Sequence, residues 1–185
     1  MIRILSWFML LGVLAVIAIA QDQSKAPLTV ASDVDLNRYM GMWYEIARLP
    51  NWFQKKCVGE VTATYTLQGD GNIIVVNRCR KANGEYSEAQ GRAKRASSKE
   101  PNTKLKVRFA PAWLSFLPMV WGDYWILILA LDYTYAVIGE PERKYLWVLS
   151  RTPEMDEITL KAILEQVRQK GYDLNGLIRT PQLIK

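Results

Sequence analysis

Short stretches in which apolar and polar residues alternate follow one another along most of this chain. Residues 60–67 alternate threonines with apolar side chains, and residues 104–109 alternate cations with Leu105, Val107 and Phe109. Because successive side chains of a strand point to opposite faces, this period of two predicts strands with one buried face. Such runs predict eight strands, over residues 43–48, 60–67, 73–80, 85–95, 104–109, 124–131, 136–139 and 145–151.

Turn-forming residues separate these runs and leave room for one amphipathic helix. Residues 69–72 and the Asn83-Gly84 pair suit tight hairpins, because Gly and Asn accept the positive φ that these turns need. Residues 156–170 carry apolar side chains at helical spacing, and Gly171 is placed to end that helix. Eight strands linked in sequence predict an all-β fold, an antiparallel up-and-down barrel that leaves no sheet edge unpaired.

The first residues have the pattern of a secretory signal peptide. Arg3 precedes an almost wholly apolar run, residues 4–19, that ends in small residues suited to cleavage. The run is shorter than the ~20 residues that a membrane span needs, so a permanent anchor is the alternative. We expect residues 1–20 to be removed, residues 21–34 to form a flexible segment, and residues 35–185 to form one domain.

Charge and composition argue against several classes of function. The chain has 24 Lys and Arg against 18 Asp and Glu, but these cations are scattered and form no basic helix, so we expect no nucleic-acid partner. The absence of histidine excludes His-based triads and removes the commonest metal ligand. No GxSxG, HExxH or phosphate-loop motif is present in the sequence. We therefore expect neither an enzyme nor a metal or cofactor site.

The two cysteines, Cys57 and Cys79, suggest a disulfide. Thiols of exported chains are usually oxidised, and closing this loop would stabilise the fold by roughly 3 kcal/mol. Counting outward from the turn at residues 69–72 leaves the two misaligned by about five residues, so a bulge is needed to bring them together. Two free or metal-binding thiols are the alternative.

Three segments of the chain resemble, in their order and spacing, the signature segments of the lipocalins. Gly41-x-Trp43 opens the first predicted strand, Asp132 precedes a tyrosine in a late turn, and Arg151 closes the last strand. The Gly-x-Trp-Tyr-Glu-Ile-Ala-Arg and Leu-Ser-Arg-Thr-Pro forms are most similar to the bacterial branch, whose relatives include apolipoprotein D. The resemblance implies an eight-stranded up-and-down barrel with the helix packed outside, which forms a cup for a ligand.

The signature residues are expected to be structural. Counting strand directions places Gly41, Trp43, Asp132 and Arg151 at one closed end of the barrel. We expect Trp43 to plug this floor and Arg151 to lie across the indole, a cation–π contact worth roughly 0.5–2 kcal/mol. Gly41 would let the chain pass closely beneath the barrel because it has no side chain.

A barrel of eight strands is either filled by its own side chains or holds one small ligand. Residues 124–131 are apolar on both faces, so Trp125 and Leu127 are chosen there without help from alternation. Glu45 shares the face of Trp43 and is either a satisfied structural carboxylate or a polar anchor for a ligand. The residues expected to line the ligand site are Tyr65, Val107, Phe109, Trp125, Leu127, Tyr145, Trp147 and Leu149.

The loop over residues 111–122 carries large apolar side chains and no charge. It belongs to the open end of the barrel, and exposed apolar patches commonly mark interaction sites. Three readings are open, namely a lid over the mouth, a contact with a membrane surface, and a contact with a partner protein. The residues concerned are Trp113, Leu114, Phe116, Leu117, Met119 and Trp121.

The resemblance implies transport or storage of small hydrophobic ligands, and for the bacterial branch fatty acids or (lyso)phospholipids of the cell envelope. The alternatives are a non-lipid ligand such as a tetrapyrrole or isoprenoid, a thiol-dependent enzyme using Cys57, and a barrel with no ligand. Many bacterial lipocalins are lipidated on a cysteine just after the apolar run, but no cysteine precedes Cys57 here. We therefore expect a periplasmic or secreted protein, with outer-membrane association as the alternative, and either a monomer or a homodimer.

Overall fold

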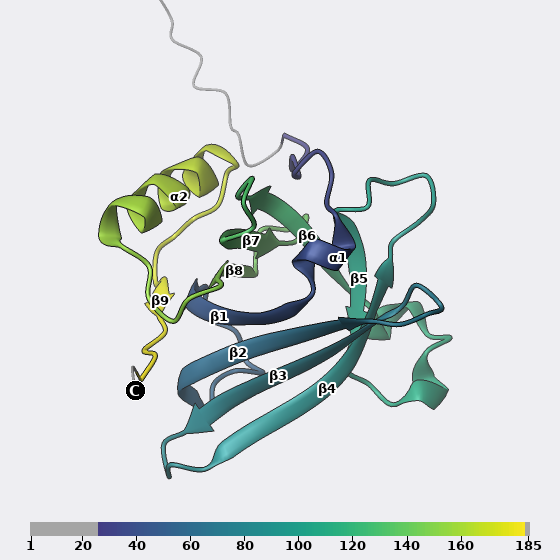
Figure 1. The fold of residues 1–185 in the computed structure, drawn as a ribbon, viewed down its shortest axis with the longest axis horizontal. Helices are drawn as coiled ribbons and strands as arrows, with labels where there is room; N and C mark the ends of the chain where they lie inside the picture. The colour runs from purple at the N-terminus through teal and green to yellow at the C-terminus, as the bar shows by residue number, and fades with distance from the viewer. Residues whose placement is uncertain (1–25, 184–185) are drawn as a thin grey trace, which may run out of the picture.

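The computed structural model describes residues 26–183 and shows a closed antiparallel β-barrel (Figure 1). Eight strands form the wall in the order β2-β3-β4-β5-β6-β7-β8-β1, and β1 also pairs with β2, which closes the ring. The fold class expected from the sequence is confirmed. The elements are α1 (Leu36–Tyr39), β1 (Gly41–Arg48), β2 (Cys57–Leu67), β3 (Ile73–Lys81), β4 (Tyr86–Arg95), β5 (Lys104–Arg108), η2 (Ala112–Leu114), η3 (Pro118–Val120), β6 (Gly122–Leu129), β7 (Tyr135–Gly139), β8 (Leu146–Ser150), α2 (Glu157–Gln169) and β9 (Ile178–Arg179).

The expected signal peptide, residues 1–20, lies outside the described residues. Between residues 26 and 183, no helix is long and apolar enough to cross a membrane.

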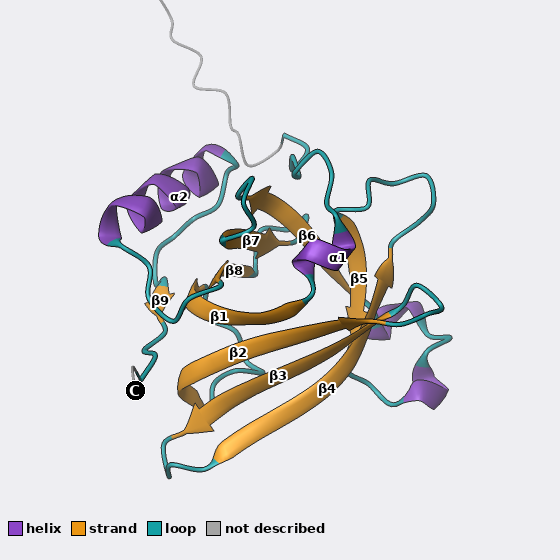
Figure 2. Cartoon of the chain, viewed as in Figure 1, coloured by secondary structure: helices purple, strands orange, loops and turns teal. Residues whose placement is uncertain are grey.

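Helix α2 lies outside the barrel wall, whereas α1 lies across one end of the barrel (Figure 2). The α2 helix begins after Asp156, whose carboxylate accepts a hydrogen bond from the backbone N–H of Thr159 at 2.8 Å and so satisfies a donor that the first turn leaves free. Its apolar face packs on the outer face of the wall and forms an outer core. The α2 residues buried there are Leu160, Ile163 and Val167.

A second core lies inside the barrel and fills its closed half. Trp43, Tyr65 and Ile126 are all buried in it, together with Tyr39 from α1. The barrel therefore has an apolar core on its inner face and a second apolar core on its outer face where α2 covers it. This division explains the sequence pattern of β6.

The expected inner face of β6 is wrong. Tyr124 and Ile126 pack in the inner core, whereas Leu127 lies in the outer core and Trp125 packs against it. The helix buries the outer face of β6, so that strand is apolar on both faces and alternation gives no orientation.

The segment before the first strand packs on the barrel from residue 26 onwards, in place of the flexible lead-in expected over residues 21–34. Leu28 and Val34 are buried, and the backbone N–H of Ala31 donates to the carbonyl of Ile126 at 2.9 Å. Residues 21–25 lie outside the described part of the chain.

The barrel has one seam, where β1 and β2 part. Their ladder runs from Gly41 paired with Tyr65 to Tyr44 paired with Thr62 and then stops. Beyond that point the end of β1 pairs with β9 instead, as Figure 1 shows for the C-terminal segment beside β1. The sequence analysis did not predict this ninth strand.

Residues 178–182, here termed the C-terminal strap, replace the missing ladder. The carbonyl of Pro181 accepts a hydrogen bond from the N–H of Glu60 in β2 at 2.7 Å. The Gln182 Nε2 bridges the seam, because it donates to one carbonyl of β1 at 2.8 Å and to one of β2 at 3.1 Å. The strap therefore satisfies backbone groups that would otherwise be open sheet edge.

Candidate functional site

The closed end of the barrel is built on Trp43. Its ring is fully buried, and its Nε1 donates to the carbonyl of Tyr39 at 2.9 Å. The guanidinium carbon of Arg151 lies 3.8 Å from the centroid of the Trp43 ring, and the guanidinium donates to three backbone carbonyls from residues 38–42. Partial burial lowers the pKa of Arg151, which still leaves an arginine protonated at neutral pH.

Gly41 and Asp132 shape the backbone beneath this floor. Gly41 has a φ of +92°, and a Cβ there would lie 3.4 Å from Nη1 of Arg151, so a larger residue would be strained beside the guanidinium. The Asp132 carboxylate accepts hydrogen bonds from the hydroxyl of Thr134 at 2.7 Å and from its N–H at 3.1 Å. These bonds hold the pKa of Asp132 below its usual value.

Open space lies beside Gly122 at the mouth of the barrel. Gly122 faces inward on β6, since it is opposite the inward-facing Val107 and two residues before Tyr124. Apart from the chain neighbours, a methyl group on Gly122 would have one protein atom within 4 Å, the carbonyl oxygen of Val107 at 3.8 Å. Val107, Tyr124 and Trp147 also remain partly exposed although they belong to the inner face. Solvent-accessible space therefore reaches into the barrel.

Most of the expected lining residues do face inward. Phe109 lies at the mouth, where its ring covers the inner face of Gly91 so closely that a Cβ there would lie 2.7 Å from it. The expected residues in or against the inner core are Tyr65, Val107, Trp147 and Leu149.

An aromatic wall stands near the open end. Tyr145 stacks on Trp147, with ring centroids 6.1 Å apart and an interplanar angle of 25°. Phe53, from the loop between β1 and β2, contacts both rings with centroid distances of 5.6 Å and 6.2 Å. Phe53 lies between the predicted strands over residues 43–48 and 60–67, and nothing in the sequence pattern places its ring here.

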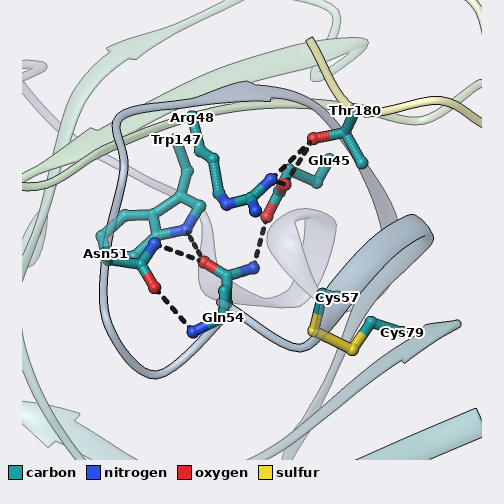
Figure 3. Close-up of a disulfide and its surroundings, with 8 residues drawn as sticks. All are labelled: Glu45, Arg48, Asn51, Gln54, Cys57, Cys79, Trp147 and Thr180. Carbon is teal, nitrogen blue, oxygen red and sulfur yellow. Dashed lines mark hydrogen bonds and ion pairs between the residues drawn. A yellow bond between two sulfur atoms is a disulfide. The ribbon is translucent and has the colours of Figure 1, made fainter. Parts of the chain in front are cut away.

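Glu45 belongs to a buried polar network in the wall (Figure 3). One carboxylate oxygen accepts from Arg48 at 3.1 Å and also from the Thr180 hydroxyl, while the other accepts from Gln54 Nε2 at 2.7 Å. Gln54 in turn accepts from Trp147 Nε1 at 2.9 Å. Glu45 is therefore a satisfied structural carboxylate, because a buried ion pair of this kind needs such hydrogen bonds to be tolerated.

Cys57 and Cys79 form a disulfide near the seam (Figure 3), with Cα atoms 5.5 Å apart. The bulge that the sequence required is present, since the β2–β3 register shifts twice, between Cys57 and Gly59 and between Gly59 and Thr62. Both cysteines of the chain are engaged in this bond, so neither is a thiol nucleophile. Within the described residues, no group of three or more potential metal ligands is placed to hold an ion.

The loop between β5 and β6 exposes an apolar surface. Trp113, Phe116 and Met119 are 72%, 75% and 85% exposed, so these side chains point to solvent and do not form a lid inside the mouth. Trp121 holds the loop, because its Nε1 donates to the carbonyl of Ser115 at 2.8 Å. The remaining expected residues, Leu114 and Leu117, are half-buried.

Comparison with known proteins agrees with this architecture. A family model described as a lipocalin-like domain matches residues 34–182. Temperature-induced lipocalin-1 of Arabidopsis thaliana is 45% identical over 85% of this chain and 84% of its own length. Outer membrane lipoprotein Blc of Vibrio cholerae is 37% identical over 82% and 84%, and apolipoprotein D of Mus musculus is 31% identical over 83% and 79%.

The solved structure of insecticyanin from the tobacco hornworm Manduca sexta shares the fold, with a TM-score of 0.64 at 22% identity over 85% of this chain and 86% of that one. The closed barrel agrees with the family match. The chain belongs to the lipocalin family, in the branch that includes the bacterial Blc proteins and apolipoprotein D.

Proposed function

We propose that this lipocalin binds one small hydrophobic ligand in its lumen, a fatty acid or (lyso)phospholipid, and transports or stores it. The observation that carries the proposal is the unfilled space at Gly122, above a floor that is closed by Trp43. A concave apolar site with few polar groups is the usual form of a small-molecule pocket.

The character of the lining favours an acyl chain. Val107, Phe109 and Leu149 give it an aliphatic and aromatic surface, and the carboxylate of Glu45 is already satisfied by protein partners. A chain of methylene groups gains about 0.8 kcal/mol for each one that it buries. A sugar or nucleotide would lose hydration in this lumen without gaining comparable hydrogen bonds.

Filling the lumen tests the proposal. The Gly122→Trp variant places an indole in the open space, at a glycine whose φ a larger residue can adopt. Gly69→Trp is the matched control, because this glycine lies in the exposed β2–β3 turn and has no atom near its would-be Cβ. Each protein is purified without detergent and examined by native mass spectrometry for bound lipid, and by titration with a fluorescent fatty acid.

We expect lipid on the wild type and on Gly69→Trp, and a large loss of binding in Gly122→Trp. Equal binding by all three proteins would move the ligand site out of the lumen. Failure of the wild type to bind any hydrophobic probe would refute the proposal. A bound tetrapyrrole or isoprenoid would retain the cup but replace the ligand class.

We propose further that the loop between β5 and β6 touches a membrane surface during ligand exchange. Trp113, Phe116 and Met119 form its exposed apolar tip, and indoles favour the interface of a bilayer. An exposed cation lies at its base, since Nζ of Lys94 lies 4.3 Å from the Trp121 ring centroid. An apolar tip with a cation behind it suits an anionic lipid surface.

A paired substitution tests this contact. Trp113→Asp with Phe116→Asp should strongly reduce sedimentation with phosphatidylglycerol vesicles. Leu131→Asp is the control, because Leu131 is 97% exposed but lies in the turn at the opposite end of the barrel. Unchanged sedimentation of the paired variant, or an equal loss in the control, would contradict the assignment of this loop.

We propose that the protein acts in the periplasm or outside the cell after removal of residues 1–20. The apolar run of residues 4–19 and the disulfide support export. The intact mass of the protein from its own cells should match a chain that begins after residue 20. A mass that retains the first 20 residues would point to the anchored alternative.

A further inference from the structure

Three tyrosine hydroxyls meet between the closed floor and the open lumen. Tyr39 from α1, Tyr65 from β2 and Tyr124 from β6 form this tyrosine triad. The Tyr124 hydroxyl oxygen lies 2.7 Å from that of Tyr39 and 2.8 Å from that of Tyr65. The triad is therefore a chain of two hydrogen bonds with Tyr124 at its centre.

A count of protons leaves one donor of this triad without a protein acceptor. Each hydroxyl carries one O–H donor and two acceptor lone pairs. Three donors serve two hydrogen bonds, and none of the three hydroxyls bonds to any other described residue. One O–H therefore remains, and leaving such a buried donor unpaired costs about 1–3 kcal/mol.

All three hydroxyls stay protonated across the physiological range. Burial raises the pKa of Tyr39 and of Tyr124 well above the usual value, and it raises the pKa of Tyr65 to about 12. The triad therefore presents neutral donors and no phenolate at neutral pH.

The free donor belongs on the lumen side of the triad. Tyr39 and Tyr65 are almost completely buried, whereas Tyr124 is only half-buried and lies two residues from the open space at Gly122. When Tyr39 and Tyr65 both donate to Tyr124, its two lone pairs are filled and its own O–H is free to point into the lumen. Two donated bonds polarise that O–H and strengthen it as a donor.

The triad is a poor site for an ionised group. Arg151, the cation that acts on Tyr39, is already engaged by the Trp43 ring and by three backbone carbonyls. A carboxylate buried without a free cation loses hydration free energy, and a single hydrogen bond restores only a small part of it. An uncharged oxygen has no such cost.

We propose that the tyrosine triad selects ligands that carry an uncharged oxygen acceptor, such as a carbonyl, ester or hydroxyl, at the end buried deepest in the lumen. This inference rests on the proposed function, since it assumes that the lumen is the ligand site. It fixes the direction of an amphiphilic ligand, because an ionised headgroup is then held towards the open end. The remainder of the ligand is an acyl or isoprenoid chain.

Two probes that differ only in the oxygen test the triad. The assay measures displacement of a fluorescent fatty acid from the wild type and from Tyr124→Phe. The competing probes are a long-chain methyl ketone and the alkane of the same chain length. We expect Tyr124→Phe to weaken the ketone about tenfold and to change the alkane by less than about twofold. Tyr65→Phe should keep most of the preference for the ketone, because the free O–H of Tyr124 remains.

Tyr135→Phe is the matched control, since Tyr135 packs in the outer core and touches no ligand in this scheme. Binding of the fatty acid to the wild type tests the proposed function separately. The fatty acid can bind to the wild type while Tyr124→Phe leaves the ratio of ketone affinity to alkane affinity unchanged. In that case the lumen is the site but the triad donates only to water, and the inference is wrong. An equal loss for both probes also overturns it. Failure of every probe on the wild type removes the proposed function and the inference together.

Discussion

Replacement of Trp43 by alanine should destabilise the protein severely while leaving its ligand preference intact. The side chain is fully buried, and Trp-to-Ala changes in a core typically cost about 3–5 kcal/mol. The change also removes one of the two hydrogen bonds to the Tyr39 carbonyl and the ring beneath the Arg151 guanidinium, a cation–π contact worth roughly 0.5–2 kcal/mol. We take about 4–6 kcal/mol as the expected loss, because these contributions overlap.

In a domain of this size, each kcal/mol lowers Tm by roughly 2–4 °C, so Trp43→Ala should melt roughly 8–24 °C below the wild type. Thermal unfolding followed by circular dichroism measures this difference. Trp113→Ala is the matched control, because the same substitution at a side chain that is 72% exposed should change stability by less than about 0.5 kcal/mol. Fatty-acid affinities are compared at a temperature at which all three proteins are folded.

The reasoning fails if Trp43→Ala and Trp113→Ala melt at the same temperature. It also fails if Trp43→Ala is as stable as the wild type but no longer binds ligand, since Trp43 would then belong to the ligand site and not to the floor.

Three further perturbations have calculable outcomes. The paired change Cys57→Ala with Cys79→Ala removes a disulfide that spans 22 residues and should lower the free energy of unfolding by roughly 3 kcal/mol. Reductant should lower the denaturant midpoint of the wild type by the same amount and should not change the midpoint of the variant. Gln182→Ala removes two hydrogen bonds across the seam and should cost about 1–3 kcal/mol by the same denaturant titration, and a change below about 0.3 kcal/mol would mean that the strap holds without it. Burial raises the pKa of Tyr65 to about 12 from the usual 10. The protonated hydroxyl therefore stabilises the folded state fully below pH 10, and this contribution of roughly 3 kcal/mol to the free energy of unfolding is lost as the pH rises from 10 to about 12. Tyr65→Phe should therefore show a shallower alkaline decline in unfolding free energy than the wild type, and identical slopes would contradict the buried-hydroxyl assignment.

Local pattern was enough to predict the wall of the barrel. Short runs of strand-forming residues bounded by turns located every strand from β1 to β8, and the helical spacing before Gly171 located α2. These elements are set by residues that are near one another in sequence and by the burial of one face. Each of these produces a periodic pattern that can be read from a single sequence. The floor was predictable for another reason, since the Trp43–Arg151 pair belongs to a family signature.

The failures share a different cause. Trp125 and Leu127 were wrongly assigned to the lumen. Their side chains are apolar because α2 covers the outer face of β6, and this contact between distant parts of the chain cannot be read from the sequence of β6. One overlooked signal was Asp123, whose charge and ion pair with Lys106 at 2.7 Å put it on the outside, and this makes Tyr124 an inward residue. The β9 strand is only two residues long, too short for any periodicity.

The strap has a consequence for biosynthesis. A nascent polypeptide leaves the ribosome with its N-terminus first, so residues 178–182 emerge long after β1 and β2, and the slot between these two strands stays unsealed until then. Any product cut short by a premature stop codon or a carboxypeptidase would expose that slot as a free edge for intermolecular strand pairing. Only a molecule that carries the strap buries these edges, which protects it from the aggregation that unpaired strand edges promote.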